Sequence, residues 1–298
     1  MMAYLLRYFD PERGARLGYM GDGKVFDITE KVGSMIAWLQ SSVGHVMASI
    51  QELESFISSE TLAYTFVDLD RVPRLGLAYL LAPVDQQEVW AAGVTYTRSR
   101  QARQQEAQDG GDIYARVYGA DRPELFFKSL GEKVVGQHQA VGIRADAAWS
   151  VPEPELALVL NPALEVVGMT IGNDMSSRDI EGANPLYLPQ AKVYTASCAL
   201  GPAIALQTLT EWPQVSIRMN IRRKGEEVFS GQTDTSMIQR RLDELVAYLG
   251  RSASFSYGAV LLTGTGVVPP EMFTLQEGDE VRIAIDDIGE LINTVRVV

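Results

Sequence analysis

Cysteine and histidine are scarce in this sequence of 298 residues, and long apolar runs are missing. The single cysteine, Cys198, excludes an intrachain disulfide. His45 lies in a segment without other chemistry and is expected to be structural or at the surface, and His138, between two glutamines, is expected to be exposed. No apolar run approaches the ~18 residues of a membrane span, and charge interrupts the N-terminal segment too early for a signal peptide. These absences predict a reducing, cytoplasmic setting.

Positive charge is also in deficit. The formal net charge is −12 and the pI is about 4.7, so that nucleic acid and anionic membrane surfaces would be repelled. We therefore expect a small-molecule ligand, and an acidic one would need a local cation. The hydrophobic content of 46% is enough for a substantial core, and the length favours about two domains.

The first part of the chain alternates between strand and helix patterns. Residues 3–9 and 16–27 are expected to form short antiparallel strands. Asp27 and Glu30 then have the spacing of a capping box, and apolar residues recur at helical spacing from 35 to 53. Gly44 is expected to weaken or divide this helix.

Residues 68–85 carry two prolines and no clear period, which is typical of a connection. They are expected to link a small N-terminal α/β domain, residues 1–85, to a second domain, residues 86–298. A polar helix with three arginines is expected over residues 96–106. The polar, glycine-rich run 109–121 is longer than a usual loop, which favours a mobile lid. The predicted fold class is α+β.

The richest chemistry lies in the middle of the chain. Glu153 and Glu155 stand two residues apart at the head of an apolar strand, and the period of two directs both carboxylates to one face. A turn follows, and the returning strand brings Asp174 back toward the start of the first. Such an all-oxygen set suits a hard cation, Mg²⁺ first with Mn²⁺ or Ca²⁺ as alternatives, and not zinc. The alternative interpretation is a solvated strand face.

Three further residues could belong to the same site. Lys192 lies among apolar and small residues, and a lysine partly desolvated beside a metal ion could act as a base; otherwise it is a lysine whose ammonium reaches the surface. Glu124 follows a proline at the start of a strand, and a glutamate in such a position usually lies at the surface. Thr265 lies in the turn 264–266, whose amides and hydroxyl could contact an anionic ligand.

Seven stretches of the chain together resemble the fumarylacetoacetate hydrolase superfamily over residues 86 to 298. They are Gly93-Val-Thr-Tyr96, Pro152-Glu-Pro-Glu155, Gly172-Asn-Asp174-Met-Ser-Ser-Arg178-Asp179, Gln190-Ala-Lys192, Leu200-Gly-Pro202, Gly231-Gln-Thr233 through Met237-Ile238, and Gly264-Thr265-Gly266. The Glu-x-Glu pair followed by the Asn-Asp-x-Ser-x-Arg-Asp run makes this resemblance specific.

The resemblance implies a C-terminal mixed β-roll or sandwich domain of the fumarylacetoacetate hydrolase type. It implies Glu153, Glu155 and Asp174 as metal ligands, Lys192 as the active-site lysine, and a homodimer or homotetramer.

One departure from the family pattern bears on the reaction. Hydrolytic members carry a His-x-x-Glu pair after residue 96, whereas this chain has Ser99 about where the histidine would stand. Water activation thereby loses its usual base. The chain resembles more closely the branch of 2-keto-3-deoxy-D-arabinonate dehydratases, in which the residues matching Glu124 and Lys192 are implied as the acid and base pair. Arg98, Ser99 and Thr265 are candidates for holding the substrate carboxylate and hydroxyls.

The expected reaction is the dehydration of a 2-keto-3-deoxy sugar acid, with 2-keto-3-deoxy-D-arabinonate giving 2,5-dioxopentanoate as the first candidate. The cation acts as a Lewis acid that stabilises the enolate. Lys192 is expected to take the C3 proton and Glu124 to protonate the leaving C4 hydroxyl. The alternatives are an acylpyruvate hydrolase or oxaloacetate decarboxylase, and a non-catalytic binding protein on the same fold.

Overall fold

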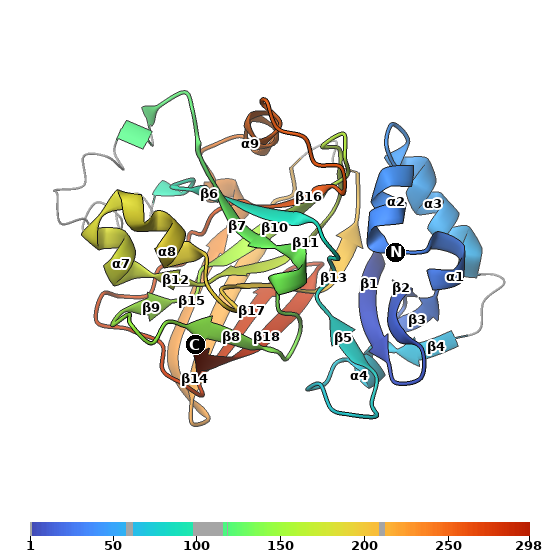
Figure 1. The fold of residues 1–298 in the computed structure, drawn as a ribbon, viewed down its shortest axis with the longest axis horizontal. Coiled ribbons are helices and arrows are strands. Elements are labelled where there is room, and N and C mark those ends of the chain that lie inside the picture. The colour runs from blue at the N-terminus through green and yellow to red at the C-terminus, as the bar shows by residue number, and fades with distance from the viewer. Residues whose placement is uncertain (1, 58–61, 98–115, 118, 209–211) are drawn as a thin grey trace.

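The computed structural model describes residues 2–57, 62–97, 116, 117, 119–208 and 212–298. Strands dominate, as the α+β prediction requires, and the helices lie at the periphery (Figure 1). No helix within these ranges is long and apolar enough to cross a membrane.

Eleven strands of the described chain form one large sheet. In spatial order they are β4 (Leu62–Thr65), β3 (Lys24–Asp27), β2 (Gly14–Gly21), β1 (Ala3–Asp10), β13 (Cys198–Leu206), β11 (Val166–Asp174), β10 (Pro154–Leu160), β16 (Ala259–Leu262), β6 (Glu88–Gly93) and β7 (Glu124–Leu130), with β5 (Tyr79–Leu81) also paired to β1. Neighbours are antiparallel except β16 and β6, which are parallel. Because β1 pairs with β13, the N-terminal strands extend the sheet that carries the central residues. The division near residue 85 stays a prediction.

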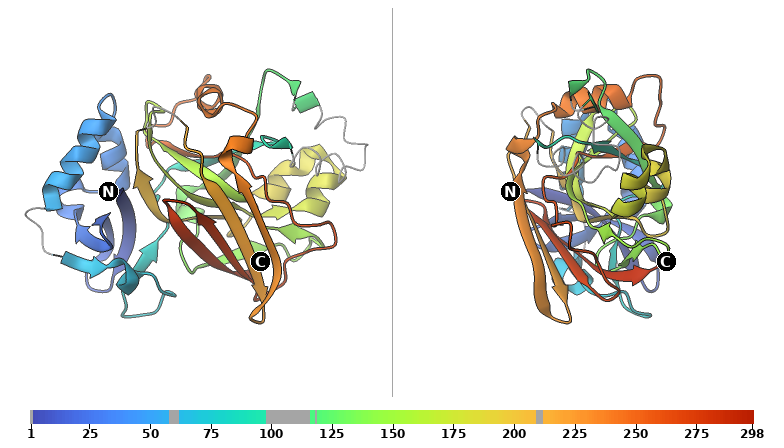
Figure 2. Two further views of the ribbon diagram at one scale, coloured as in Figure 1. Left: turned by 180° about the vertical axis from the view of Figure 1, so that it is seen from behind. Right: turned by 90° about the vertical axis from the view of Figure 1, so that its left-hand side faces the viewer.

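A five-stranded sheet packs on one part of the large sheet and forms the second layer; its strands face the viewer in the left view of Figure 2. Its order is β15 (Glu226–Asp234), β14 (Ser216–Arg223), β17 (Glu280–Ile285), β18 (Gly289–Val297) and β8 (Ala140–Ile143). The core between the layers is built from alternating residues of both sheets, such as Leu158 and Ile171 from one and Ile217 and Ile283 from the other. This arrangement agrees with the expected sandwich.

The N-terminal helices cover the outer strands. They are α1 (Thr29–Val32), α2 (Met35–Ser41), α3 (Val46–Ile57) and, after β4, α4 (Phe66–Leu69). As expected, Gly44, with a φ of +79°, separates two helices within the amphipathic segment. The predicted capping box is wrong, because Ile28 precedes α1 and Asp27 accepts a hydrogen bond from the Thr29 amide instead.

Both histidines lie away from the central carboxylates. His45 is exposed immediately before α3. The prediction of an exposed His138 is wrong, because its ring is half-buried and its Nε2 lies 2.9 Å from Asp70 Oδ1. A carboxylate partner explains why this residue is withdrawn from solvent between its two glutamines.

The remaining elements surround the central part of the sheet. They are β9 (Ser150–Val151), β12 (Ser176–Ser177), α7 (Arg178–Ala183), α8 (Leu188–Lys192), α9 (Leu242–Leu249) and three short 3-10 helices at Gly131–Lys133, Pro185–Tyr187 and Thr235–Met237. Figures 1 and 2 show α7 and α8 at the end of the molecule opposite the N-terminal helices. They approach the start of β10 and the end of β11, where the three carboxylates lie.

Candidate metal and acid–base site

The hairpin of β10 and β11 positions the three candidate ligands. Glu155 pairs with Gly172, and the Asp174 amide donates to the Glu153 carbonyl at 2.9 Å. Because strand residues two apart share a face, Glu153, Glu155 and Asp174 point to the same side of the sheet. The side chain of Leu262 fills the space beside Gly172, where a Cβ atom would overlap it.

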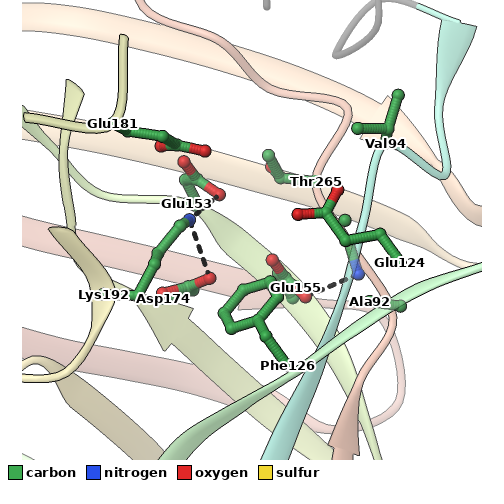
Figure 3. Close-up of a pocket in the computed structure, with 12 residues that line it drawn as sticks. Ala92, Val94, Glu124, Phe126, Glu153, Glu155, Asp174, Glu181, Lys192 and Thr265 are labelled. Atoms are coloured by element: carbon green, nitrogen blue, oxygen red, sulfur yellow. Dashed lines mark hydrogen bonds and ion pairs between the residues drawn. The ribbon is translucent and has the colours of Figure 1, made fainter. Parts of the chain in front are cut away.

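The three carboxylates converge in a buried cavity (Figure 3). One oxygen from each lies within 4.8 Å of the others, and the three residues are at most 4% exposed. A solvated strand face is therefore excluded. Buried carboxylates at this spacing form an oxygen-only donor set, which fits a hard divalent cation such as Mg²⁺. The triad could hold one metal ion.

One oxygen of each carboxylate has a partner in the surrounding protein. Arg178 Nη2 lies 3.0 Å from Glu153 Oε1. The Gly264 amide donates to Glu155 Oε2 at 2.5 Å, and Lys128 Nζ lies 2.5 Å from Asp174 Oδ1. Contacts of this kind fix the orientation of metal ligands.

Lys192 ends the short helix α8 and enters the cavity. It is 2% exposed, which excludes an ammonium that reaches the surface. Its Nζ donates to Glu153 Oε2 and Asp174 Oδ2 at 3.0 Å each and to Ser176 Oγ at 2.6 Å. The Phe126 ring covers it with a centroid 5.5 Å away. The structure thus places Lys192 beside the carboxylates, as the sequence interpretation required.

Glu124 lines the same cavity from the first position of β7, on the side away from Lys192 (Figure 3). It pairs with Gly93 of β6, and its carboxyl group lies directly over that glycine. A Cβ atom at position 93 would overlap the carboxyl group. Gly93 is therefore the reason that Glu124 can turn inward.

The turn 264–266 closes another wall of the cavity. Thr265 is 4% exposed and lines it, but its hydroxyl is within hydrogen-bonding distance of the backbone of Val267. The amide of Gly264 meets a carboxylate of the protein, that of Glu155. The anionic group that this turn contacts in the structure is therefore the Glu155 carboxylate of the protein.

Two candidate substrate-binding residues, Arg98 and Ser99, lie outside the described residues, as does nearly all of the polar helix predicted over 96–106. Most of the predicted lid, 109–121, also falls outside them. Its described end is tied to the body of the protein, because Arg240 donates to the carbonyls of Val117 and Asp121.

The electrostatics of the cavity favour a cation. Burial, followed by the neighbouring charges of Asp174 and Glu153, raises the pKa of Glu155 well above its usual value. Five carboxyl groups and three cationic side chains surround the space. They are Glu124, Glu153, Glu155, Asp174 and Glu181, and Lys128, Arg178 and Lys192. Fully ionised, these described groups carry an excess of two negative charges, which one divalent cation would neutralise.

Four buried residues at this site were given no role by the sequence analysis: Lys128, Ser176, Arg178 and Glu181. Ser176 and Arg178 belong to the run that follows Asp174, so their proximity was available from the motif. Glu181 lies one helical turn beyond Arg178, which is enough to return to the same face. Lys128 gave no signal beyond a charge in an apolar strand.

Comparisons with known proteins identify the family of this chain. The family profile described as fumarylacetoacetate (FAA) hydrolase C-terminal matches residues 88–296. A probable 2-keto-3-deoxyxylonate dehydratase of Haloferax volcanii is 50% identical over 217 residues, covering 72% of this chain and 74% of the relative. A 2-dehydro-3-deoxy-D-arabinonate dehydratase of Saccharolobus solfataricus is 40% identical over 218 residues, covering 72% and 73%.

A solved structure is similar over the whole length. It is a 2-keto-3-deoxy-D-arabinonate dehydratase complexed with magnesium and 2,5-dioxopentanoate. It is 31% identical, with a TM-score of 0.83 and coverage of 100% of this chain and 99% of the other.

Proposed function

Because the chain belongs to the fumarylacetoacetate hydrolase family, we propose that it is a hydro-lyase that dehydrates a 2-keto-3-deoxy sugar acid. The first candidate substrate is 2-keto-3-deoxy-D-arabinonate, with 2,5-dioxopentanoate as product. The observation that carries the proposal is one buried cavity that combines an oxygen-only metal triad, a buried lysine and a second acid. The dehydratase relatives support the choice of reaction.

The two sugar names among the relatives do not conflict. D-Arabinonate and D-xylonate differ only at C2 and C3, and neither carbon is a stereocentre once C2 is a ketone and C3 a methylene. The D-forms of the two names therefore describe the same 2-keto-3-deoxy acid.

Glu153, Glu155 and Asp174 would hold the divalent cation, with Mg²⁺ first and Mn²⁺ or Ca²⁺ as alternatives. When bound, it would supply Lewis-acid chemistry that polarises the 2-keto group and stabilises negative charge on its oxygen. The residues fit this role because their donor set is all oxygen and each carboxylate is oriented by a neighbouring group.

Lys192 and Glu124 divide the proton transfers. Neutral Lys192 takes a proton from C3, since its Nζ opens to the same cavity as the triad. Protonated Glu124 donates to the C4 hydroxyl, which leaves as water, and C3 and C4 become doubly bonded. A proton shift from C5 to C3 then gives an enol with a C4–C5 double bond, and transfer of its hydroxyl proton to C4 gives the terminal aldehyde. Arg98, Ser99 and Thr265 are proposed to bind the substrate carboxylate and hydroxyls.

Product analysis tests the reaction. With Mg²⁺ and 2-keto-3-deoxy-D-arabinonate, we expect a single product lighter by one water, and none after EDTA treatment until Mg²⁺ is restored. Cleavage of an acylpyruvate into two acids, or release of CO₂ from oxaloacetate, with no dehydration, would instead support a hydrolase or a decarboxylase. Absence of any metal-dependent reaction would favour a binding protein.

Hydrogen exchange separates the two proton transfers. In D₂O, 2-oxobutanoate has an exchangeable C3 proton and no C4 hydroxyl, so that only the first step can occur. Lys192→Ala should lose both exchange and dehydration by about 10²–10⁴-fold, whereas Glu124→Gln should lose dehydration by a similar factor and keep exchange. Near-normal dehydration in both variants would refute the assignment.

We further propose that the chain is cytoplasmic and assembles as a homodimer or homotetramer. The family resemblance supports the assembly, and the single buried cysteine is compatible with a reducing compartment. Light scattering coupled to size-exclusion chromatography would measure the oligomer size.

A further inference from the structure

Lys128 is a fully buried cation that the proposed mechanism does not use. It is 0% exposed, and its Nζ lies 2.5 Å from Asp174 Oδ1. The same nitrogen donates to the carbonyl of Lys192 at 2.5 Å and to that of Met175 at 2.9 Å. Lys128 Nζ thus has one ion-pair partner and two hydrogen-bond acceptors.

The backbone of β7 is irregular at this residue. Val89 pairs with Ser129 and Trp90 pairs with Phe127, which leaves Lys128 as an extra residue between two regular pairs. A β-bulge of this kind redirects a side chain. The strand thus departs from its regular pairing where the side chain enters the site.

We propose that Lys128 is a positioning residue that holds a metal ligand and the catalytic base in a fixed relation. The inference rests on the proposed function. Lys128 contacts Asp174 Oδ1 and thereby orients the carboxylate so that its other oxygen, Oδ2, faces Lys192. By donating to the Lys192 carbonyl, it also satisfies a terminal acceptor of α8 and anchors the residue that carries the base.

Lys128 joins these two groups through a single nitrogen atom. Arg178 contacts Glu153, and the contact of Gly264 with Glu155 comes from a backbone amide. Lys128 contacts both Asp174 and the Lys192 backbone. Its loss should therefore disturb ligand geometry and base position together.

The choice of metal ion separates orientation from charge. Removing a positive charge near the triad would strengthen the binding of any divalent cation by a similar factor. Loss of ligand orientation acts unequally, because Mg²⁺ demands near-ideal octahedral geometry whereas Ca²⁺ accepts flexible coordination. The ratio of the two dissociation constants, Mg²⁺ over Ca²⁺, therefore reports on orientation with the charge effect largely cancelled.

The experiment measures this ratio in Lys128→Met. Mg²⁺ or Ca²⁺ displaces bound Mn²⁺, and electron paramagnetic resonance detects the Mn²⁺ that is released. We expect the ratio to rise by about tenfold, the lower end of the usual effect of removing a partner of a metal ligand. The control is Lys133→Met, the same change at an exposed lysine five residues along the chain; its ratio should match the wild type. A ratio in folded Lys128→Met within about twofold of the wild-type value would overturn the proposal.

A second readout addresses the base. With metal at saturation, Lys128→Met should lower the rate of C3 exchange by about 10²-fold, as a displacement of roughly 1 Å does at a reacting group. An unchanged rate would overturn the link to Lys192. Should the methionine variant not fold, Lys128→Gln keeps an N–H donor and undergoes both measurements with the same criteria.

Failure of this inference and of the proposed function are distinguishable. If the wild-type protein binds none of the three cations, the proposed function fails at its metal site. If it binds them and the variant ratio and exchange rate are unchanged, only the role of Lys128 fails.

Discussion

Substitution of Gly93 by alanine should displace the carboxyl group of Glu124 while the glutamate itself is retained. A Cβ atom at this position would overlap the Oε2 and Cδ atoms of Glu124, so that the carboxyl group must turn out of its place in the cavity. Gly93 does not adopt a positive φ, and the overlap involves the end of a flexible side chain. The fold should therefore survive, and reduced freedom of the unfolded chain would partly offset the crowding.

The magnitude follows from the displacement. An overlap of this size moves the carboxyl group by roughly 1 Å or more, which costs about 10²-fold in rate at a reacting group. This corresponds to about 2.7 kcal/mol of activation free energy. We expect Gly93→Ala to lower kcat for dehydration by that factor while C3 exchange of 2-oxobutanoate stays near the wild-type rate.

The assay compares four proteins: wild type, Gly93→Ala, Glu124→Gln and the double variant. If the alanine acts through Glu124, the double variant should be no slower than Glu124→Gln, because the effects of residues in contact are not additive. Gly21→Ala is the control, since the nearest atom to its added Cβ lies at an ordinary 3.7 Å. Additive losses, or an equal loss of exchange and dehydration in Gly93→Ala, would refute the reasoning.

Three other measurements test separate parts of the structure. The pKa of Glu155 is raised in the folded protein, so Mg²⁺ must displace a proton that stays bound above the usual glutamate range, and the affinity for Mg²⁺ should rise with pH as Glu155 loses this proton. Calorimetry in two buffers of different ionisation enthalpy would detect the released proton. A binding heat that does not depend on the buffer would contradict the prediction. Leu158→Ala removes a fully buried side chain between the two sheets and should lower the free energy of unfolding by about 2–5 kcal/mol in urea titrations, with a change under 1 kcal/mol speaking against this core. Burial raises the pKa of the Cys198 thiol to about 12, so a disulfide reagent should label one thiol in denaturant and none in the native protein; rapid native labelling would contradict its placement.

Local pattern was enough to predict the central hairpin. The alternation of Glu153 and Glu155 and the return of the chain to Asp174 follow from the geometry of two antiparallel strands joined by a turn. The motifs also sufficed for the family and its metal ligands as expectations. These features depend on residues close in sequence, whose relative positions the backbone dihedral angles determine.

Pairing between distant strands decided the rest. Glu155 meets the Gly264 amide because β10 lies beside β16, and Glu124 reaches the cavity because β7 pairs with β6 over Gly93. No local period encodes which strands become neighbours. Lys128 shows the limit most clearly, since its three partners come from the end of β11, the residue after that strand and the end of α8. A buried lysine has a purpose only once those acceptors surround it, and only the tertiary structure brings them together.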